Sequence, residues 1–241
     1  MRVKAIIQYD GTDYFGFQKQ SQTAQTVAGE LERTLRSLHI DVTIVGSGRT
    51  DRGVHATGQV IHFDLPSYWQ DLERLQTILN RKLSSIFIKQ LICVNSQFHA
   101  RFSAKKRSYR YLFKTTQPSV FEQDYIAYYP PFDGEILKEA LSLFQGEHDF
   151  CYFHKTGSPT HTTIREVYQA RYRPLSRGYH MILFQANGFL RSQVRMMVES
   201  AMLSARGELT LASLQEQLQG KKQHTSRLAP ASGLYLSKIL Y

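Results

Sequence analysis

The sequence predicts an α+β protein made of two consecutive halves, each with the element order βαββαβ. Two observations point to this class. Apolar residues alternate in some segments and recur at helical spacing in others, and the order found in residues 1–103 returns in residues 104–241. This order defines a ferredoxin-like unit, an antiparallel sheet with helices on one face. We therefore expect two tandem ferredoxin-like halves whose antiparallel sheets join, with the helices packed on one face.

The first half is expected to contain four strands and two helices. Alternating apolar residues indicate a strand over residues 3–9, and apolar residues three or four positions apart indicate a helix over residues 27–38. The same patterns then predict a strand beginning at residue 42, a strand over 59–64, a helix over 72–79 and a strand over 86–94.

The second half repeats this order after a polar, basic stretch. We expect a strand over residues 107–114 and a helix over 137–144, for which Asp133 is the predicted N-cap. Two strands follow, over 165–173 and 179–186, and then an apolar helix over 194–201. A shorter helix over 211–218 is the one insertion, and the last strand covers 233–239.

The charge balance favours a polyanionic partner. Lys and Arg total 30 against 20 Asp and Glu, which gives a formal charge of +10 and a sequence pI near 9.6. The 14 Tyr and 14 Phe, several of them next to Arg or Lys, strengthen the case for RNA, because unpaired bases stack on aromatic faces.

The cysteine count and the hydropathy pattern limit the protein class further. Cys93 and Cys151 are too few for a disulfide framework or a four-cysteine zinc site, so we expect a reducing compartment, the cytoplasm. No apolar stretch approaches the length of a membrane span, and no membrane partner is expected. His148, Cys151 and His154 are spaced by three, but no second pair of ligands accompanies them, so no metal is predicted.

The segment Gly46–Ala56 is the strongest candidate site. It lies between the second and third expected strands and combines three glycines with Arg49, Asp51, Arg52 and His55. One interpretation is a glycine-rich turn in which Asp51 binds its own backbone, and the other is an active-site loop. The segment matches neither a dinucleotide fingerprint nor a P-loop, so no nucleotide cofactor is expected.

Two further segments carry candidate residues. Residues 99–111 join a basic cluster to a strand on which Tyr109 and Tyr111 share a face, where one ring stacks on a base or both pack beneath the sheet. Arg195 lies within the apolar pattern of a helix, so its charge either reaches solvent or meets a buried carboxylate.

Six segments together resemble the tRNA pseudouridine synthase A family, over nearly the whole chain. In order, they are YDGTDYFGFQ at residues 9–18, GRTDxGVHA at 48–56, FHARFSA at 98–104, RxYxY at 107–111, NxF with VR between 187 and 195, and AxGLYL at 231–236.

The resemblance implies a cofactor-free homodimer that converts uridine to pseudouridine in the tRNA anticodon stem-loop, at positions 38, 39 and 40. It implies that Asp51 is the catalytic carboxylate, Tyr109 the active-site tyrosine that holds the substrate base, and Arg195 the arginine that pairs with the aspartate. It also implies that Arg49 helps to extrude the target nucleotide. The expected RNA-binding residues are Arg49, Arg52, His55, Arg101, Lys105, Lys106, Arg107 and Arg110.

Three positions depart from the family pattern. Arg52 replaces a small residue after the aspartate, Ser84 replaces a proline, and Gln193 stands where methionine is common. A related synthase with another RNA target is therefore one alternative, and a non-catalytic RNA-binding protein is another. The sequence lacks the RRM signature that many RNA-binding modules carry. A nuclease would require a metal cluster or paired histidines at the glycine-rich loop, and the sequence shows neither there.

Overall fold

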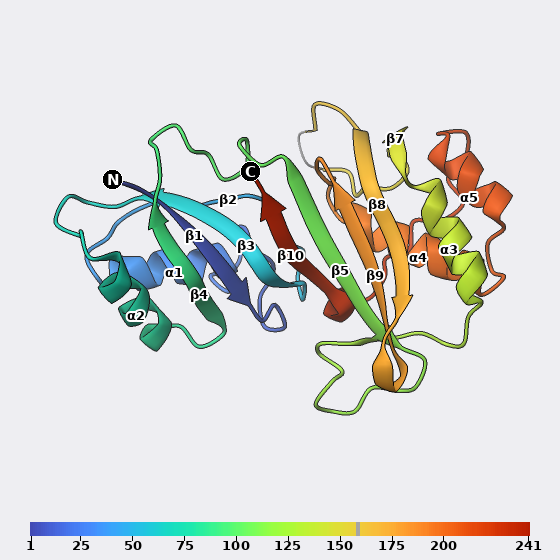
Figure 1. The fold of residues 1–241 in the computed structure, drawn as a ribbon, viewed down its shortest axis with the longest axis horizontal. Coiled ribbons are helices and arrows are strands. Elements are labelled where there is room, and N and C mark those ends of the chain that lie inside the picture. Colours follow the sequence, from blue (N-terminus) through green and yellow to red (C-terminus); the bar gives the residue numbers. More distant parts are fainter. Residues whose placement is uncertain (158–159) are drawn as a thin grey trace. The chain divides into compact units, whose positions relative to one another are not determined.

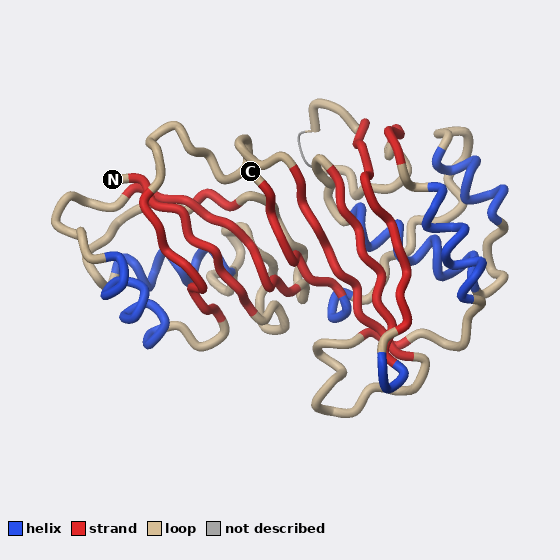
Figure 2. Tube along the Cα trace, in the orientation of Figure 1, coloured by secondary structure: helices blue, strands red, loops and turns tan. Residues whose placement is uncertain are grey.

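The computed structural model describes residues 1–157 and 160–241, and the chain divides into two compact units. Unit 1 contains residues 1–105 and 235–241, and unit 2 contains residues 106–234. The expected strands and helices form in both (Figure 1), except that the strand expected to begin at residue 42 is reduced to residues 45–46. Within each unit the strands form one layer, and the helices form a second layer beside it (Figure 2). No helix of the described residues is long and apolar enough to cross a membrane.

Unit 1 begins with the βαββαβ order that the sequence predicts. Its elements are β1 (Arg2–Tyr9), α1 (Val27–Arg36), β2 (Val45–Gly46), β3 (His55–Asp64), α2 (Leu72–Lys82) and β4 (Ile86–Cys93), to which the chain's last strand, β10 (Leu234–Leu240), is added. The strand order is β4-β1-β3-β10, and β1 is antiparallel to both β3 and β4.

The core of unit 1 follows from the alternation of β1 and the caps of the helices. Val3, Ala5 and Ile7 are fully buried on one face of β1. Thr26 accepts a hydrogen bond from the Gly29 amide at the start of α1, and Asp71 does the same for Arg74 at the start of α2. The caps fix where the two helices begin, and the apolar stripes of the helices, with Leu31 and Leu75, are buried.

The last strand of the chain, β10, lies next to β3 in the strand order. The sequence places residues 233–239 in the second half, but most of this strand belongs to unit 1, where it pairs in parallel with β3. Since β1 occupies one edge of β3, β10 and the short strand β2 share the other edge, β10 at His55 and Ala56 and β2 at Ile61 and His62. Gly58 permits the approach, because a Cβ there would lie 2.3 Å from the Ser237 carbonyl oxygen.

The strands of unit 2 follow one another in the order β5-β9-β8-β7. Its elements are β5 (Lys106–Lys114), β6 (Ala127–Tyr128), α3 (Gly134–Leu143), β7 (Gly146–Asp149), β8 (Ile164–Pro174), the 3₁₀ turn η1 (Ser176–Gly178), β9 (Tyr179–Ala186), α4 (Gln193–Ala205), α5 (Leu211–Leu218) and the 3₁₀ turn η2 (Ala231–Gly233). The side chain of Asp133 accepts from the Glu135 and Ile136 amides, which confirms the predicted N-cap of α3.

The sequence did not predict β6 and β7, and β6 pairs with β5 in parallel. Both strands are short: β6 has two residues and β7 has four, so neither shows enough periods of alternation to be recognised.

Candidate active site

Asp51 lies in the loop between β2 and β3, and the segment after β1 holds this loop in place. The Phe17 amide donates to the Thr50 carbonyl oxygen at 3.1 Å, and the Gly53 amide donates to the Tyr14 carbonyl oxygen at 3.3 Å. The residues on both sides of Asp51 are thus tied to the same neighbouring segment. This is a fixed loop, as catalysis by a positioned carboxylate requires.

Thr50 is the main anchor of the loop. It is buried, and its hydroxyl is 2.8 Å from the Tyr9 hydroxyl at the end of β1. Farther along, the Val54 amide donates to the Asp51 carbonyl oxygen at 3.2 Å, and the Gln59 amide group donates to the Gly48 carbonyl oxygen at 2.7 Å. Thr50 was not among the predicted site residues, because an uncharged residue between two charged ones gives no sign in the sequence that it is buried.

Two glycines in the neighbouring segment make this close packing possible. A Cβ at Gly11 would lie 2.1 Å from the Val54 carbonyl oxygen, and one at Gly16 would lie 2.7 Å from the Thr50 carbonyl oxygen. Gly16 also has a φ of 105°, which residues with a side chain rarely adopt. The glycines of this segment therefore contribute as directly to the Asp51 loop as those within it.

The charged side chains of the loop differ in exposure. Arg49 and Arg52 are exposed, whereas Asp51 is half-buried. The Arg52 guanidinium lies 4.4 Å from the centre of the Phe15 ring, which is within cation–π range. The departure at Arg52 is therefore accommodated by an aromatic ring of the neighbouring segment.

His55 is buried rather than presented to RNA. Its exposed fraction is 2%, its ring stacks on Tyr235 at 4.8 Å, and its Nδ1 accepts from the Gly11 amide at 3.0 Å. The Asp10 carboxylate lies 3.3 Å from the same Nδ1. These contacts argue against the expected RNA contact, and we assign His55 to positioning the loop.

Tyr109 and Tyr111, both on β5 of unit 2, differ in their surroundings. Tyr111 is fully buried and donates to the Pro230 carbonyl oxygen at 3.1 Å, and burial raises its pKa above the ordinary value. Tyr109 is 7% exposed and meets the Phe189 ring edge to face at 5.2 Å. Tyr111 is thus a core residue, and Tyr109 remains the candidate for contact with a base.

Arg195 is held by the backbone of its own unit. Its Nε donates to the Ala229 carbonyl oxygen at 2.7 Å, and the Ala229 amide donates to the Arg195 carbonyl oxygen at 3.1 Å. This reciprocal pair fixes the plane of the guanidinium, so the side chain does not simply extend into solvent. Asp51 belongs to unit 1 and Arg195 to unit 2, and the pairing between them stays a prediction.

Gln193 has a structural reason to replace methionine. It is fully buried at the start of α4, where its Oε1 accepts from the Leu190 amide at 2.8 Å and its Nε2 contacts the Met197 sulfur at 3.6 Å. The preceding Ser192 has a φ of 60°, so the chain turns sharply here. The amide of Gln193 closes this turn on the helix that carries Arg195.

The remaining predicted RNA-binding residues fall into two groups. Arg101, Lys105 and Arg110 are exposed. Lys106 and Arg107 are half-buried and engaged within unit 2: Lys106 lies 4.3 Å from the centre of the Tyr168 ring, and Arg107 donates to the Asn187 carbonyl oxygen at 2.8 Å. The exposed group carries the more accessible positive charge.

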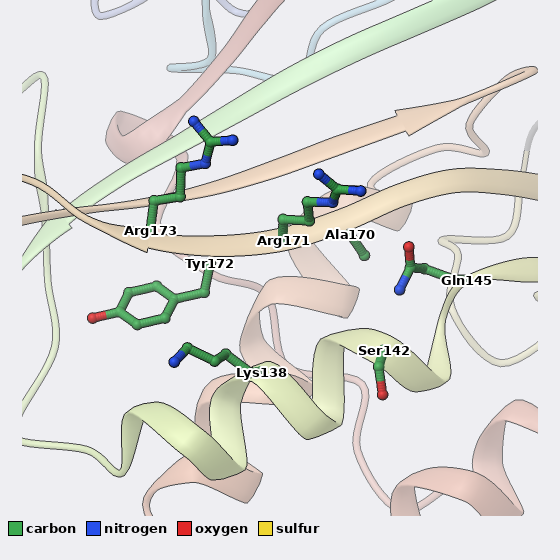
Figure 3. Close-up of a pocket in the computed structure, with 7 residues that line it drawn as sticks. All are labelled: Lys138, Ser142, Gln145, Ala170, Arg171, Tyr172 and Arg173. Atoms are coloured by element: carbon green, nitrogen blue, oxygen red, sulfur yellow. The ribbon is translucent and has the colours of Figure 1, made fainter.

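A groove of about 350 Å³ lies between α3 and β8 and has several cations around it. Figure 3 shows Arg171 and Arg173 extending from the side of β8 opposite to Tyr172, away from α3. On α3, Lys138 pairs with Glu135 at 2.6 Å. The cations do not converge, so the groove is not built as an anion site. Within the described residues, no group of His, Cys, Asp or Glu is arranged to hold a metal ion.

Comparison with known proteins identifies the class. The model of the tRNA pseudouridine synthase family matches residues 5–103 and 140–241. A tRNA pseudouridine synthase A of Helicobacter hepaticus is 42% identical over 244 residues, with 99% of this chain and 98% of that protein covered. One of Campylobacter jejuni is 38% identical over 242 residues, and all of both chains is covered.

The matches define a pseudouridine synthase, an isomerase that acts on RNA. More narrowly, this chain belongs to the tRNA pseudouridine synthase A family. The alternative of a non-catalytic RNA-binding protein is therefore set aside.

Proposed function

We propose that this synthase converts uridine to pseudouridine in the anticodon stem-loop of tRNA, at positions 38, 39 and 40, with Asp51 as the catalytic carboxylate. The anchored loop is the observation that carries the proposal. The backbone on both sides of Asp51 is tied to the segment after β1, and exposed arginines flank the half-buried carboxylate. A carboxylate fixed among cations suits a reaction on a polyanionic substrate.

The reaction breaks the glycosidic C–N bond, turns the uracil and rejoins it to the ribose through a carbon atom. It needs no net oxidation or reduction. An ionised Asp51 begins the reaction by attacking the substrate or by accepting a ribose proton, and both routes start from the charged form. The target nucleotide must first leave the stack of bases, a step in which Arg49 is proposed to assist.

Tyr109 and Arg195 complete the proposed site from unit 2. Tyr109 is proposed to hold the extruded base against its ring, and Arg195 to pair with the Asp51 carboxylate. Two observations support these roles: Tyr109 is less deeply buried than the core residue Tyr111, and Arg195 has a guanidinium plane fixed by Ala229. The homodimer is proposed from the family resemblance, and sedimentation velocity tests it.

Replacing Asp51 by asparagine tests the catalytic assignment. We expect Asp51→Asn to abolish pseudouridine formation while the Kd for tRNA stays within a few-fold of wild type, because losing a negative charge does not weaken polyanion binding. Asp41→Asn is the matched control, since it removes an exposed carboxylate in the same unit. Measurable turnover by Asp51→Asn would refute the assignment.

Arg52 supports one alternative within the same activity. A guanidinium stacked on Phe15 and exposed next to Asp51 puts a positive charge where the family has a small residue, which can shift the choice of RNA or of position. Pseudouridine mapping of total RNA, from cells with and without the gene, distinguishes the anticodon stem-loop target from a different RNA or position. Loss at positions 38–40 supports the main proposal, and loss elsewhere supports the alternative.

A further inference from the structure

The loop that follows β4 presents a single aromatic ring, Phe102, to solvent. The exposed fraction of Phe102 is 75%, and its ring stacks on the ring of His99 with centroids 4.3 Å apart and planes inclined by 27°. The Arg101 guanidinium lies 5.5 Å from the centre of the Phe102 ring. One exposed phenylalanine is ordinary on a protein surface, so the case depends on how this ring is supported.

Hydrogen bonds fix the ring on which Phe102 rests. The Nδ1 of His99 accepts from the Arg101 and Phe102 amides, both at 3.2 Å, so the imidazole is tied to the backbone of the residue it supports. The turn closes on itself, because the His99 amide donates to the Ser103 hydroxyl and the Ser103 amide donates to the His99 carbonyl oxygen, at 3.0 and 2.9 Å. Phe102 is therefore held before any ligand arrives.

The inner side of the loop is anchored to the sheet of unit 1. Ala100 is fully buried, its amide donates to His62 Nδ1 at 3.1 Å, and its carbonyl oxygen accepts from the Tyr241 hydroxyl at 2.9 Å. The His62 ring lies 4.9 Å from the His99 ring. Three rings thus follow one another from the interior outward, and only the last, Phe102, is broadly exposed.

We propose that the exposed ring of Phe102 stacks against an unpaired base of the tRNA substrate. The inference rests on the proposed function. A planar ring that is fixed in advance loses little entropy on stacking, and every base has a face to offer. The surroundings favour RNA over a protein partner, because the Arg101 guanidinium lies near the ring and Lys105, three residues further along the chain, is also an exposed cation. The core of an apolar protein interface would be depleted of charge.

The test compares tRNA binding by Phe102→Ala and wild type in filter-binding assays, with pseudouridine formation followed in parallel. We expect Phe102→Ala to raise the Kd about 5-fold to 150-fold, the range for loss of one stacked base. The slope of log Kd against log salt should stay unchanged, because stacking releases no counterions. Arg101→Gln should instead lower that slope if Arg101 also contacts a phosphate.

Phe121→Ala is the matched control, because Phe121 is 87% exposed and lies in unit 2. A second variant reports the contact itself: Phe102→Trp, with the chain's single Trp69 changed to Phe, should bind like wild type and lose fluorescence when tRNA is added. Any of three results would overturn the proposal that Phe102 stacks on a base. They are a Kd of Phe102→Ala within twofold of wild type, an equal loss of tRNA affinity in Phe102→Ala and Phe121→Ala, and tryptophan fluorescence that tRNA leaves unchanged.

The outcomes also separate this inference from the proposed function. If wild type forms pseudouridine in tRNA and Phe102→Ala binds normally, only the stacking platform is wrong. If wild type modifies a different RNA, the target proposal is wrong, and the same Kd comparison with that RNA shows whether Phe102 stacks on it.

Discussion

Adding one methyl group at Gly16 should destabilise the Asp51 loop from outside it. Gly16 has a φ of 105°, and an alanine Cβ there would lie 2.7 Å from the Thr50 carbonyl oxygen. The backbone strain costs about 1–3 kcal/mol. The contact also pushes on the carbonyl that accepts from the Phe17 amide at 3.1 Å, which weakens a bond of about 1 kcal/mol. We expect Gly16→Ala to lower the free energy of unfolding by about 2–4 kcal/mol.

The consequence for catalysis follows from the chain, because Asp51 comes directly after Thr50. A shift of the Thr50 carbonyl moves the Asp51 backbone, so we expect kcat to fall by more than tenfold while the KM for tRNA changes little, a loss of about 1.4 kcal/mol or more in the transition state. Urea unfolding measures the first effect, and pseudouridine formation at saturating tRNA measures the second.

Gly207→Ala is the control for the strain alone. Gly207 also has a positive φ, 75°, but a Cβ there would meet nothing within 4 Å, so alanine costs only about 1–2 kcal/mol from the backbone. If Gly16→Ala proved as stable as Gly207→Ala and kept full kcat, the reasoning that the neighbouring segment positions Asp51 would be refuted.

Two further predictions concern buried polar groups. Gln193→Met restores the residue common in the family but removes the acceptor of the Leu190 amide, so urea unfolding should show that the free energy of unfolding falls by about 1–3 kcal/mol. The control Gln145→Met, on the surface, should change it by no more than about 0.5 kcal/mol. A Gln193→Met protein as stable as wild type would contradict the prediction. Burial of His62 lowers its pKa, and the nearby His99 and Arg2 lower it further, so the unfolded state binds the proton more readily than the folded state. The free energy of unfolding should therefore fall as the pH drops below about 6.5. His62→Gln should flatten this pH dependence, whereas the control His39→Gln, at an exposed histidine, should not.

The sequence predicts the fold well wherever elements are long. β1, α1, β8 and α4 each show several periods of alternation or helical recurrence, and all were expected close to their observed bounds. It misses β6 and β7, which are too short for a pattern, and it does not predict that β10 pairs with β3. Strand pairing between distant residues, such as Leu236 with Ala56, leaves no local pattern in either segment.

The site is predicted less completely, for a related reason. Composition singles out the Asp51 loop, but it does not distinguish charged residues that face solvent from those that are held inside. His55 and Arg107 both looked like RNA contacts, and both are engaged by neighbours, His55 by the Gly11 amide and Arg107 by the Asn187 carbonyl. The anchors Thr50 and Gly16 carry no charge, so a search for chemistry passes over them.

The arrangement of anchors suggests why the proposed site tolerates the departures of this chain. The loop of Asp51 is held by residues of unit 1, and the guanidinium of Arg195 is held by Ala229 within unit 2. Each of the two residues is therefore oriented by contacts within its own unit. A guanidinium beside a carboxylate favours the ionised form, which both chemical routes require. Arg52 departs from the family pattern in the Asp51 loop and Gln193 at the start of the helix that carries Arg195, and neither departure removes the hydrogen bonds that hold these segments. Substitutions at Arg52 and at Gln193, which lie outside the proposed Asp51–Arg195 pair, should therefore affect stability independently, whereas turnover depends on the orientation of both Asp51 and Arg195.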